Sequence, residues 1–598
     1  MEKILSTYRK RRNNIISNLI CYLFFLTLFF WIDKPNGFIS VITLLAGFLI
    51  STLIAGKFII LLTKFLLDQI KILGMKWTIV WIILSLSFGI WLTLNIPLPF
   101  PPLQFNPSFD YFSLKIILFI SYSTLIGFLF FLCTIALSNL KINKSIFLDG
   151  EIHLKNMLLY SLPIFFIWSI YLLAFYPGMM SADSFNQWNQ VLTGVYVNHH
   201  PVFHTLLIWL LTRIYLSPVI VALAQIFFMA FIAGLFFSFY ESVGVPKWII
   251  WVSLLVFSII PVNGTMVNTI WKDIPHGIAV MSLVYFFIRI IYSSGQWINK
   301  WRNILLFSLI LGFISLLRHD GIIIAIGSMF TVFIFFPKHW KSWLIAFAFF
   351  LVLFLGIRGP LYQSLNVQES KSLEESSLSL YQLAAFSLPG SEPDLIIRSM
   401  QIWPPNWNCS IWSKNNPEWK NSSIDKSQPK MDIVVNFAKR IPKILLYNYR
   451  CERSLEFIVW DPYGEVRNAS HVEVLVDPNP FGIVADSKLP ALRDFIANLV
   501  IKTSYNPNLN WLFWRPALFL YITFFTISIL ILRNRNFRFS LIIIPALLQA
   551  ITLTLIFAAP NFRYYYATYL VALITIPLIF SPRMNGKTPE FQEMVQKG

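Results

Sequence analysis

The sequence predicts a polytopic α-helical membrane protein with about 13–15 apolar helices, each of roughly 20 residues. Two properties of the 598-residue chain lead to this fold class: 57% of its residues are hydrophobic and only 13% are charged. A soluble domain averages about 25% charged residues. Apolar runs of about 18 residues or more recur along the chain, and in a bilayer such runs form spanning helices.

The first part of the chain can be threaded through a membrane from its basic N-terminus, MEKILSTYRKRRNN. No small-residue cleavage site follows the long first apolar run, so we expect an uncleaved first helix. The basic loops 57–76 and 139–156 fall inside under the positive-inside rule, and the Pro-rich stretch 97–110 falls outside. The apolar segments that give this threading lie near 15–33, 38–56, 77–95, 113–138 and 157–176.

Threading backward from the basic C-terminal tail places the long polar stretch 359–510 outside. The forward and backward threadings disagree between His204 and Asn263, because three apolar segments there connect two loops that should both lie outside. The run 247–261 has about 15 residues, fewer than the roughly 20 needed to span. We interpret it as partial or re-entrant; the alternative is that one loop is on the other side.

Four regions follow from this threading: N-terminal transmembrane helices over 1–156, a transmembrane module over 157–358 with its first outer loop at 176–205, an extracytoplasmic soluble domain of α+β or mixed type over 359–510, and the last three helices with a cytoplasmic tail over 511–598. The location of the outer domain permits a disulfide between Cys409 and Cys451, although their spacing does not decide it.

The net charge of +19 belongs to the short loops, because the stretch 359–510 has 15 basic and 16 acidic residues. In short loops a basic excess sets the orientation of the helices. No Lys/Arg-rich patch lies on a foldable domain, so we exclude nucleic-acid binding.

Three polar patches gather ionisable residues on the predicted outer face. The loop 176–205 contains Asp183, and the patches 263–273 and 318–321 contain Asp273 and Asp320. Each aspartate could be a helix cap, but ionisable groups beside hydrocarbon are costly and are usually retained for pairing or function. Both readings can hold for one residue, since a cap at a helix mouth also faces the water-filled cleft.

Histidines and arginines accompany these acids. His200 and His204 are four residues apart, which can place both rings on one helix face and would suit a divalent metal, together with Asp273. The alternative is a pair of interfacial histidines hydrogen-bonded to backbone. Arg318 and Arg563 suit bidentate contacts with phosphate, or else extend to the interface from apolar helices.

The segments YPGMMSADSFNQ, HPVFHT, WKD, LLRHDG and FRYYY resemble the GT-C superfamily of multi-spanning glycosyltransferases, which use lipid-phosphate-linked sugars. More narrowly, they resemble an uncharacterised bacterial family of membrane glycosyltransferases. The resemblance covers roughly 157–360 and the last helices, and nothing in 359–510 resembles that family. A single Asp183 stands where better-known members have an acidic pair, which puts metal dependence in doubt.

The resemblance implies a sugar transferase in a bacterial plasma membrane. It would use a polyprenyl-phosphate-linked sugar, whose lipid tail lies in the bilayer, and would act on the extracytoplasmic face. Asp183 would be the general base and Asp273 the second acid, with or without a divalent ion (Mg, Mn or Zn) as a Lewis acid. Positive charge on the departing phosphate would come from Lys272, Arg318 and Arg563. Contacts with the acceptor or within the loop would come from Tyr176, Ser184, Gln187, His319 and Asp320.

The expected reaction inverts the configuration of the sugar, and the acceptor is a cell-envelope glycan, a lipid or a protein. Two other classes remain open: a lipid-linked saccharide transporter, or a non-catalytic partner in the assembly of envelope polysaccharide. A transporter would be expected to have charges at the middle of its helices and an inverted repeat, and neither is evident in the sequence.

Overall fold

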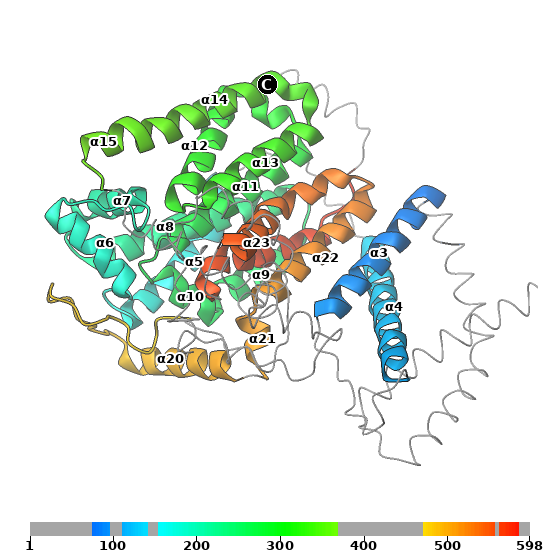
Figure 1. Ribbon diagram of the computed structural model, residues 1–598, viewed down its shortest axis with the longest axis horizontal. Helices are drawn as coiled ribbons and strands as arrows, with labels where there is room; N and C mark the ends of the chain where they lie inside the picture. The colour runs from blue at the N-terminus through cyan, green and yellow to red at the C-terminus, as the bar shows by residue number, and fades with distance from the viewer. Residues whose placement is uncertain are drawn as a thin grey trace, which may run out of the picture. The chain divides into compact units, whose positions relative to one another are not determined.

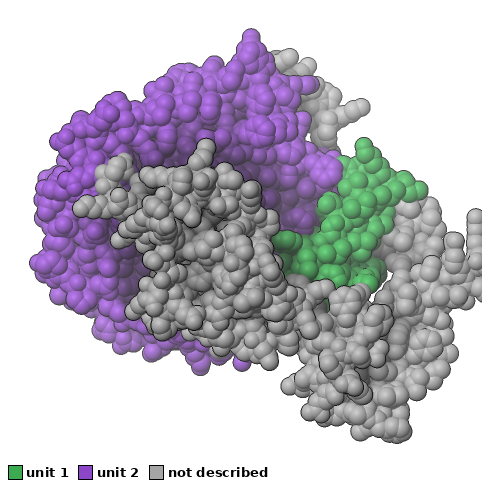
Figure 2. Space-filling view, viewed as in Figure 1, with its two compact units in different colours: residues 1–140 green, residues 141–598 purple. Residues whose placement is uncertain are grey.

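Helices build the part of the chain that the computed structural model describes, namely residue 68 and residues 74–95, 110–140, 154–368, 470–506, 508–556 and 561–584 (Figure 1). Within these ranges extended backbone pairs only at isolated bridges. The chain divides into two compact units, residues 1–140 and residues 141–598 (Figure 2). All the candidate site residues belong to the second unit.

The first unit contains two packed helices, α3 (Met75–Asn95) and α4 (Asp110–Ser138). They approach closely at Gly89 and Gly127, because a Cβ atom at Gly89 would overlap the backbone of α4. The Trp81 indole donates a hydrogen bond to Thr134 Oγ1 at 2.9 Å. Small residues at a close helix crossing, with a polar bond across it, are typical of association within a bilayer.

Seven helices in the described residues are long and apolar enough to cross a membrane. They confirm the helical, multi-pass part of the predicted fold class. Five further apolar helices in these residues are shorter, at 10–17 residues. The seven spans are α3, α5 (Leu154–Ala174), α8 (Pro218–Ser242), α11 (Asp273–Tyr292), α14 with its short extensions (Pro337–Ser364), α22 (Pro516–Asn534) and the helical stretch Phe562–Phe580 that includes α24 (Tyr566–Thr575).

Helix α11 lies at the centre of the second unit, where α8, α12 (Trp301–Leu317) and α24 pack around it. Its approach to α24 is close because Gly277 has no side chain: a Cβ there would lie 3.2 Å from Leu570. Helix α14 lies at the edge of this unit (Figure 1) and exposes large apolar side chains such as Val352 and Leu355. The first turn of the central helix α11 contains Asp273.

The run 247–261, predicted to be too short to span, is a broken helix. Helix α9 (Lys247–Ile259) ends before Pro261, and α10 (Pro261–Val267) continues at an angle of 57°. Proline has no N–H and restricts the residue before it, so a break at this point is expected. The bent pair is either a broken span or a re-entrant loop, and the sidedness of the neighbouring loops stays a prediction.

Most of the predicted outer domain, residues 369–469, lies outside the described residues, and so do Cys409 and Cys451. The two described ends of the predicted domain belong to the helical unit. Residues 357–364 form a π-helical turn (Ile357–Leu361) and α15 (Tyr362–Ser364), which continue α14. Residues 470–489 run against the loop after α5 and lead into α20 (Pro490–Tyr505).

Candidate functional site

The loop after α5 is fixed by backbone pairing with the loop before α11. The N–H of Met179 donates to the carbonyl of Asn268 at 2.9 Å, and the N–H of Ile270 donates back to the carbonyl of Met179 at 2.9 Å. Gly178 permits this approach, because its φ of 117° is one that other residues rarely adopt. The two loops therefore stay in a single register.

This register fixes where α6 (Ala182–Thr193) begins. The hydroxyl of Ser184 donates to the carbonyl of Ile270 at 2.7 Å and accepts a hydrogen bond from the N–H of Ser181 at 3.2 Å. Asp183 consequently lies in the first turn of α6, where the helix dipole favours a negative charge. The N-cap of α6 is Ser181, so the reading of Asp183 as a cap was wrong, and Asp183 lies in the first turn instead.

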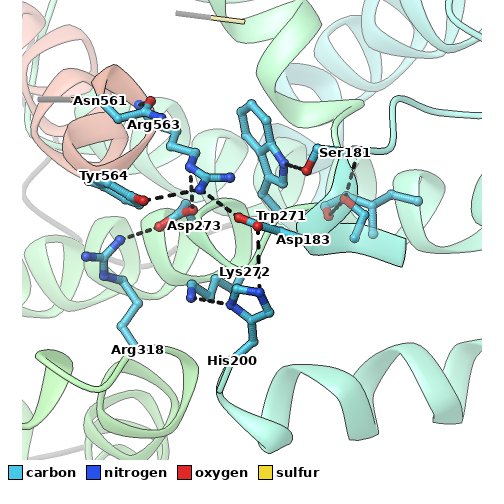
Figure 3. A network of polar contacts seen from close by, with 12 residues as sticks. Ser181, Asp183, His200, Trp271, Lys272, Asp273, Arg318, Asn561, Arg563 and Tyr564 are labelled. Carbon is cyan, nitrogen blue, oxygen red and sulfur yellow. Dashed lines mark hydrogen bonds and ion pairs between the residues drawn. The ribbon is translucent and has the colours of Figure 1, made fainter. Parts of the chain in front are cut away.

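The same pairing brings the start of α11 beside α6. Two residues after the paired Ile270, Lys272 precedes Asp273, which occupies the first turn of α11. Pro275 in that turn needs no hydrogen-bond partner for its nitrogen. Figure 3 shows the two aspartates entering one network from these two helix starts.

Arg563 joins the two aspartates from a distant part of the chain. Its Nη2 lies 2.6 Å from Asp183 Oδ2, and its Nε lies 4.0 Å from Asp273 Oδ2 (Figure 3). The turn that carries it is capped by Asn561, whose side chain accepts a hydrogen bond from the Arg563 N–H at 3.1 Å. This arrangement leaves Asp183 Oδ1 without a hydrogen bond among the described residues, and the buried Asp273 Oδ2 has none there either.

Arg318 forms the buried half of the network. It contacts Asp273 Oδ1, and it holds Asp320 with both ends of the guanidinium, at 2.9 Å from Nε to Oδ1 and 3.2 Å from Nη2 to Oδ2. All three side chains are 2% exposed. Burial of a charge is tolerated where it is paired and hydrogen-bonded, and here one cation faces two carboxylates.

His200 connects Lys272 with Asp183. The Lys272 ammonium lies 3.0 Å from His200 Nδ1, and His200 Nε2 lies 3.7 Å from Asp183 Oδ1. A lysine ammonium can only donate, so Nδ1 is the acceptor and the ring proton is on Nε2, facing the carboxylate. No carboxylate of the described residues lies within ion-pair distance of Lys272, which leaves its charge available to an anion.

Burial and charge set the protonation states around Asp183. Burial raises the pKa of Asp183, but Arg563, His200 and Lys272 outweigh it and lower that pKa below its usual value. Burial, with the neighbouring Lys272, lowers the pKa of His200 to about 3. Burial also lowers the pKa of Lys272 to about 8, against the opposing attraction of Asp273. At neutral pH the site thus holds a carboxylate, a neutral imidazole and an ammonium.

Two aromatic rings, which the sequence indicated only as part of the motifs, hold the arginines in place. The Arg563 guanidinium lies 4.8 Å from the Trp271 ring centre and 5.0 Å from the Tyr564 ring centre. Arg318 lies 5.2 Å from the same Tyr564 ring. Such cation–π contacts stabilise a cation without neutralising it. The sequence could have indicated these rings by their position, since each is next to a predicted cationic residue.

The predicted metal set of His200, His204 and Asp273 does not fit a divalent ion. His204 Nδ1 faces Gln187 Oε1 at 2.9 Å, whereas His200 faces the ammonium of Lys272, whose charge would repel a metal. No group of three or more His, Cys, Asp or Glu side chains in the described ranges could hold a metal ion. The expectation that both rings share one helix face was wrong: α7 (Val202–Thr212) begins after His200, so only His204 is inside the helix.

Of the remaining predicted contacts, two are buried within the loop and two contact basic side chains. Ser184 and Gln187 are buried and hold the loop, Gln187 by donating to Thr205 Oγ1 at 3.1 Å. Tyr176 packs under the ammonium of Lys488, at 5.0 Å from its ring centre. His319 is exposed and accepts a hydrogen bond at Nδ1 from Arg358 at 3.0 Å. Sequence reasoning missed Arg358, which stands in the π-helical turn after α14.

Comparisons with protein-family models, with curated proteins and with solved structures find no match to this chain.

Proposed function

We propose that this chain is an integral membrane glycosyltransferase of GT-C type. It transfers a sugar from a polyprenyl-phosphate-linked donor to a glycan, lipid or protein acceptor on the extracytoplasmic face of a bacterial plasma membrane. The observation that carries the proposal is the arrangement around Asp183: an ionised, partly exposed carboxylate lies beside one arginine and near one lysine without a carboxylate partner.

The exposed oxygen of Asp183 supports a role as general base. Its side chain is 37% exposed, whereas that of Asp273 is 2% exposed. Oδ2 is held by Arg563, and Oδ1 faces only the distant Nε2 of His200, so Oδ1 is the atom that would take a proton from an acceptor hydroxyl. Asp273 acts through its contacts with Arg318 and Arg563 and does not face the acceptor.

The reaction would need no other group to balance it. The acceptor oxygen attacks the anomeric carbon and gives its proton to Asp183 Oδ1. The bond between that carbon and the phosphate oxygen breaks, and its electron pair stays on the phosphate. The phosphate gains one negative charge, which Lys272 and Arg563 would stabilise where it develops. Inversion at the anomeric carbon follows from a single displacement.

The location of the charges favours a surface reaction over transport. Asp273 begins α11, Arg318 follows the end of α12, and Arg563 begins the span Phe562–Phe580. A carrier is expected to bind its substrate near the middle of the bilayer. Transport and a non-catalytic role in polysaccharide assembly thus become the outcomes if no sugar transfer is found.

The test is transfer of a radiolabelled sugar from a polyprenyl-phosphate donor in membranes that contain the protein. The variant Asp183→Asn should lose about 10²–10⁴-fold in kcat, the range for removal of a general base. Asp494→Asn is the matched control, because that carboxylate is 60% exposed and, among the residues that the structure describes, pairs only with the adjacent Arg493. Undiminished transfer by Asp183→Asn would refute the base, and no transfer by the wild type from any such donor would refute the enzyme.

A further inference from the structure

Residues 471–486, which we call the strap, lie along the loop that precedes α6. The N–H of Met180 donates to the carbonyl of Leu475 at 2.8 Å, and the N–H of Asp477 donates to the carbonyl of Met180 at 2.9 Å. The preceding residue, Met179, pairs on its other side with the loop before α11. The loop that delivers Asp183 is therefore held between two segments, one of them almost 300 residues away in the sequence.

The backbone of the strap is constrained at the point of contact. Leu475 has a φ of 62°, in the left-handed region that a leucine rarely adopts. Such conformations persist only where the surrounding structure fixes them, and they are frequent at functional sites. Here the conformation accompanies the carbonyl that accepts the Met180 N–H.

Two side chains of the strap meet the first turn of α6. Asp477 Oδ2 accepts a hydrogen bond from the N–H of Ala182 at 2.8 Å, the residue immediately before Asp183. His471 Nε2 lies 3.2 Å from Asp477 Oδ1 and 3.1 Å from the carbonyl of Met180. A carboxylate at the first amides of a helix satisfies a donor that has no partner within the helix and complements its dipole.

The strap also reaches the other member of the Asp183–Arg563 pair. The ring of His471 packs edge-on against Trp271, with 6.2 Å between ring centres. The indole of Trp271 carries the Arg563 guanidinium on its face and donates to Ser181 Oγ at 2.8 Å. The strap therefore contacts Asp183 indirectly, through the start of α6, and contacts Arg563 indirectly, through the Trp271 ring.

We propose that Asp477 and His471 are positioning residues that set the geometry of the Asp183–Arg563 pair. The proposal rests on the proposed function, since it assigns these residues to the same reaction. Neither side chain touches the pair directly, so they act through Ala182 and Trp271. We call Asp477 and His471 together the clamp. Because a displacement of about 1 Å in a site can change the rate by up to about 10²-fold, the clamp should affect turnover.

A separate apolar contact keeps the strap in place when the clamp is removed. Phe481 stacks on Phe185 of α6 with 6.0 Å between ring centres, and Val476 and Ile483 pack on the same buried cluster. Substitution of Asp477 should therefore loosen the start of α6 and leave the strap bound. Any effect on catalysis can then be separated from loss of the fold.

The activity test compares Asp477→Ala and His471→Ala with Asp486→Asn, a control on the same strap whose exposed carboxylate pairs with Lys488. We expect kcat to fall about 10–100-fold in the first two, with KM for the donor within about twofold, because Lys272 is untouched. The control should keep wild-type kcat. A wild-type kcat in Asp477→Ala, whether or not KM changes, would overturn the proposal.

A second measurement does not depend on the transferase assignment. In purified protein, hydrogen exchange of a peptide covering 177–186 should speed up in Asp477→Ala and stay unchanged in Asp486→Asn. Unchanged exchange in both variants would overturn the clamp even if the wild type transfers sugar. Faster exchange with no sugar transfer by the wild type would keep the clamp and reject the proposed function.

Discussion

Arg318 and Arg563 both face Asp273, through its two different oxygens, yet they belong to regions with different physics. Arg318 lies among carboxylates that are as buried as itself, at 2% exposure, and it satisfies two of them. Arg563 pairs with Asp183, which is 37% exposed, and lies 4.0 Å from Asp273. Arg318 is therefore enclosed between two buried carboxylates, whereas Arg563, whose own side chain is 13% exposed, pairs with a carboxylate that water reaches.

The physical reason for the difference is the cost of separating charges. Moving Arg318 away would leave two buried carboxylates without a counter-ion, which is strongly unfavourable. Moving Arg563 away from Asp183 exposes a carboxylate that water already reaches, so the cost is smaller. We therefore expect the phosphate of the proposed donor to compete for Arg563 and not for Arg318.

The largest effect should come from Arg318→Ala. Removal of one partner from a buried ion pair costs about 3–5 kcal/mol, a large fraction of a typical folding free energy. We expect little folded protein, measured as the monodisperse fraction after extraction and as the thermal midpoint. Arg302→Ala, at the exposed start of the same α12, is the control and should behave as wild type. Normal folding of Arg318→Ala would show that the buried ion pairs of Arg318 are not needed for the fold.

Arg563→Ala should instead lose activity and keep the fold. Removal of one preorganised positive group at developing charge typically costs about 10²–10³-fold in kcat. The measurement is sugar transfer at equal amounts of folded protein, with Arg493→Ala as the control, since that arginine pairs with the adjacent, exposed Asp494. If Arg563→Ala and Arg318→Ala gave the same loss of folded protein, the distinction between the two regions would fail.

The pH dependence of kcat/KM should report on the Asp183 side of the network, because Lys272 titrates there. With its pKa lowered to about 8 by burial, Lys272 is charged below that pH and neutral above it. We expect kcat/KM, which reports the free enzyme, to fall as the pH rises through about 8. Lys272→Arg should remove this fall, because arginine stays charged. A fall at pH 8 that persists in Lys272→Arg would assign the titration to another group.

The smallest effect should come from His200→Gln. The ring orients Lys272 through a single hydrogen bond at 3.0 Å, and a bond to a charged group contributes about 1.5–3 kcal/mol. We expect a decrease of about 10–150-fold in kcat/KM, mostly through KM for the donor. Added Zn²⁺ or Mg²⁺ should not restore activity. Recovery with either ion would return His200 to the role of metal ligand.

Among the residues that the structure describes, the sequence predicted the apolar helices because their signal is local; the predicted segments 15–33 and 38–56 lie outside those residues. A bilayer requires about 20 apolar residues per span, and the predicted segment 275–292 corresponds to α11 at Asp273–Tyr292. The short run 247–261 was identified by its length, and the structure shows the break there. The loop residues Asp183, Lys272, Arg318 and Arg563 could be grouped because each lies at the end of an apolar segment.

The partners of these residues depended on the tertiary structure. Spacing suggested that His200 and His204 share a metal, but packing turns one toward Lys272 and the other toward Gln187. Nothing in the local sequence of Asp477 indicates that it caps a helix 295 residues earlier in the chain. Such contacts depend on how several helices pack together, and a pattern read along one segment contains no information about that.

The helical, multi-pass class of this protein and the gathering of its rare charges at helix ends could be predicted from the chain, because hydrophobic length and charge cost are properties of short segments. The burial of Arg318 between Asp273 and Asp320, and the contact of Arg563 with Asp183, could be seen only in the folded molecule. Those pairings follow from the distances between helix ends, which the packing of α11, α12 and α24 sets.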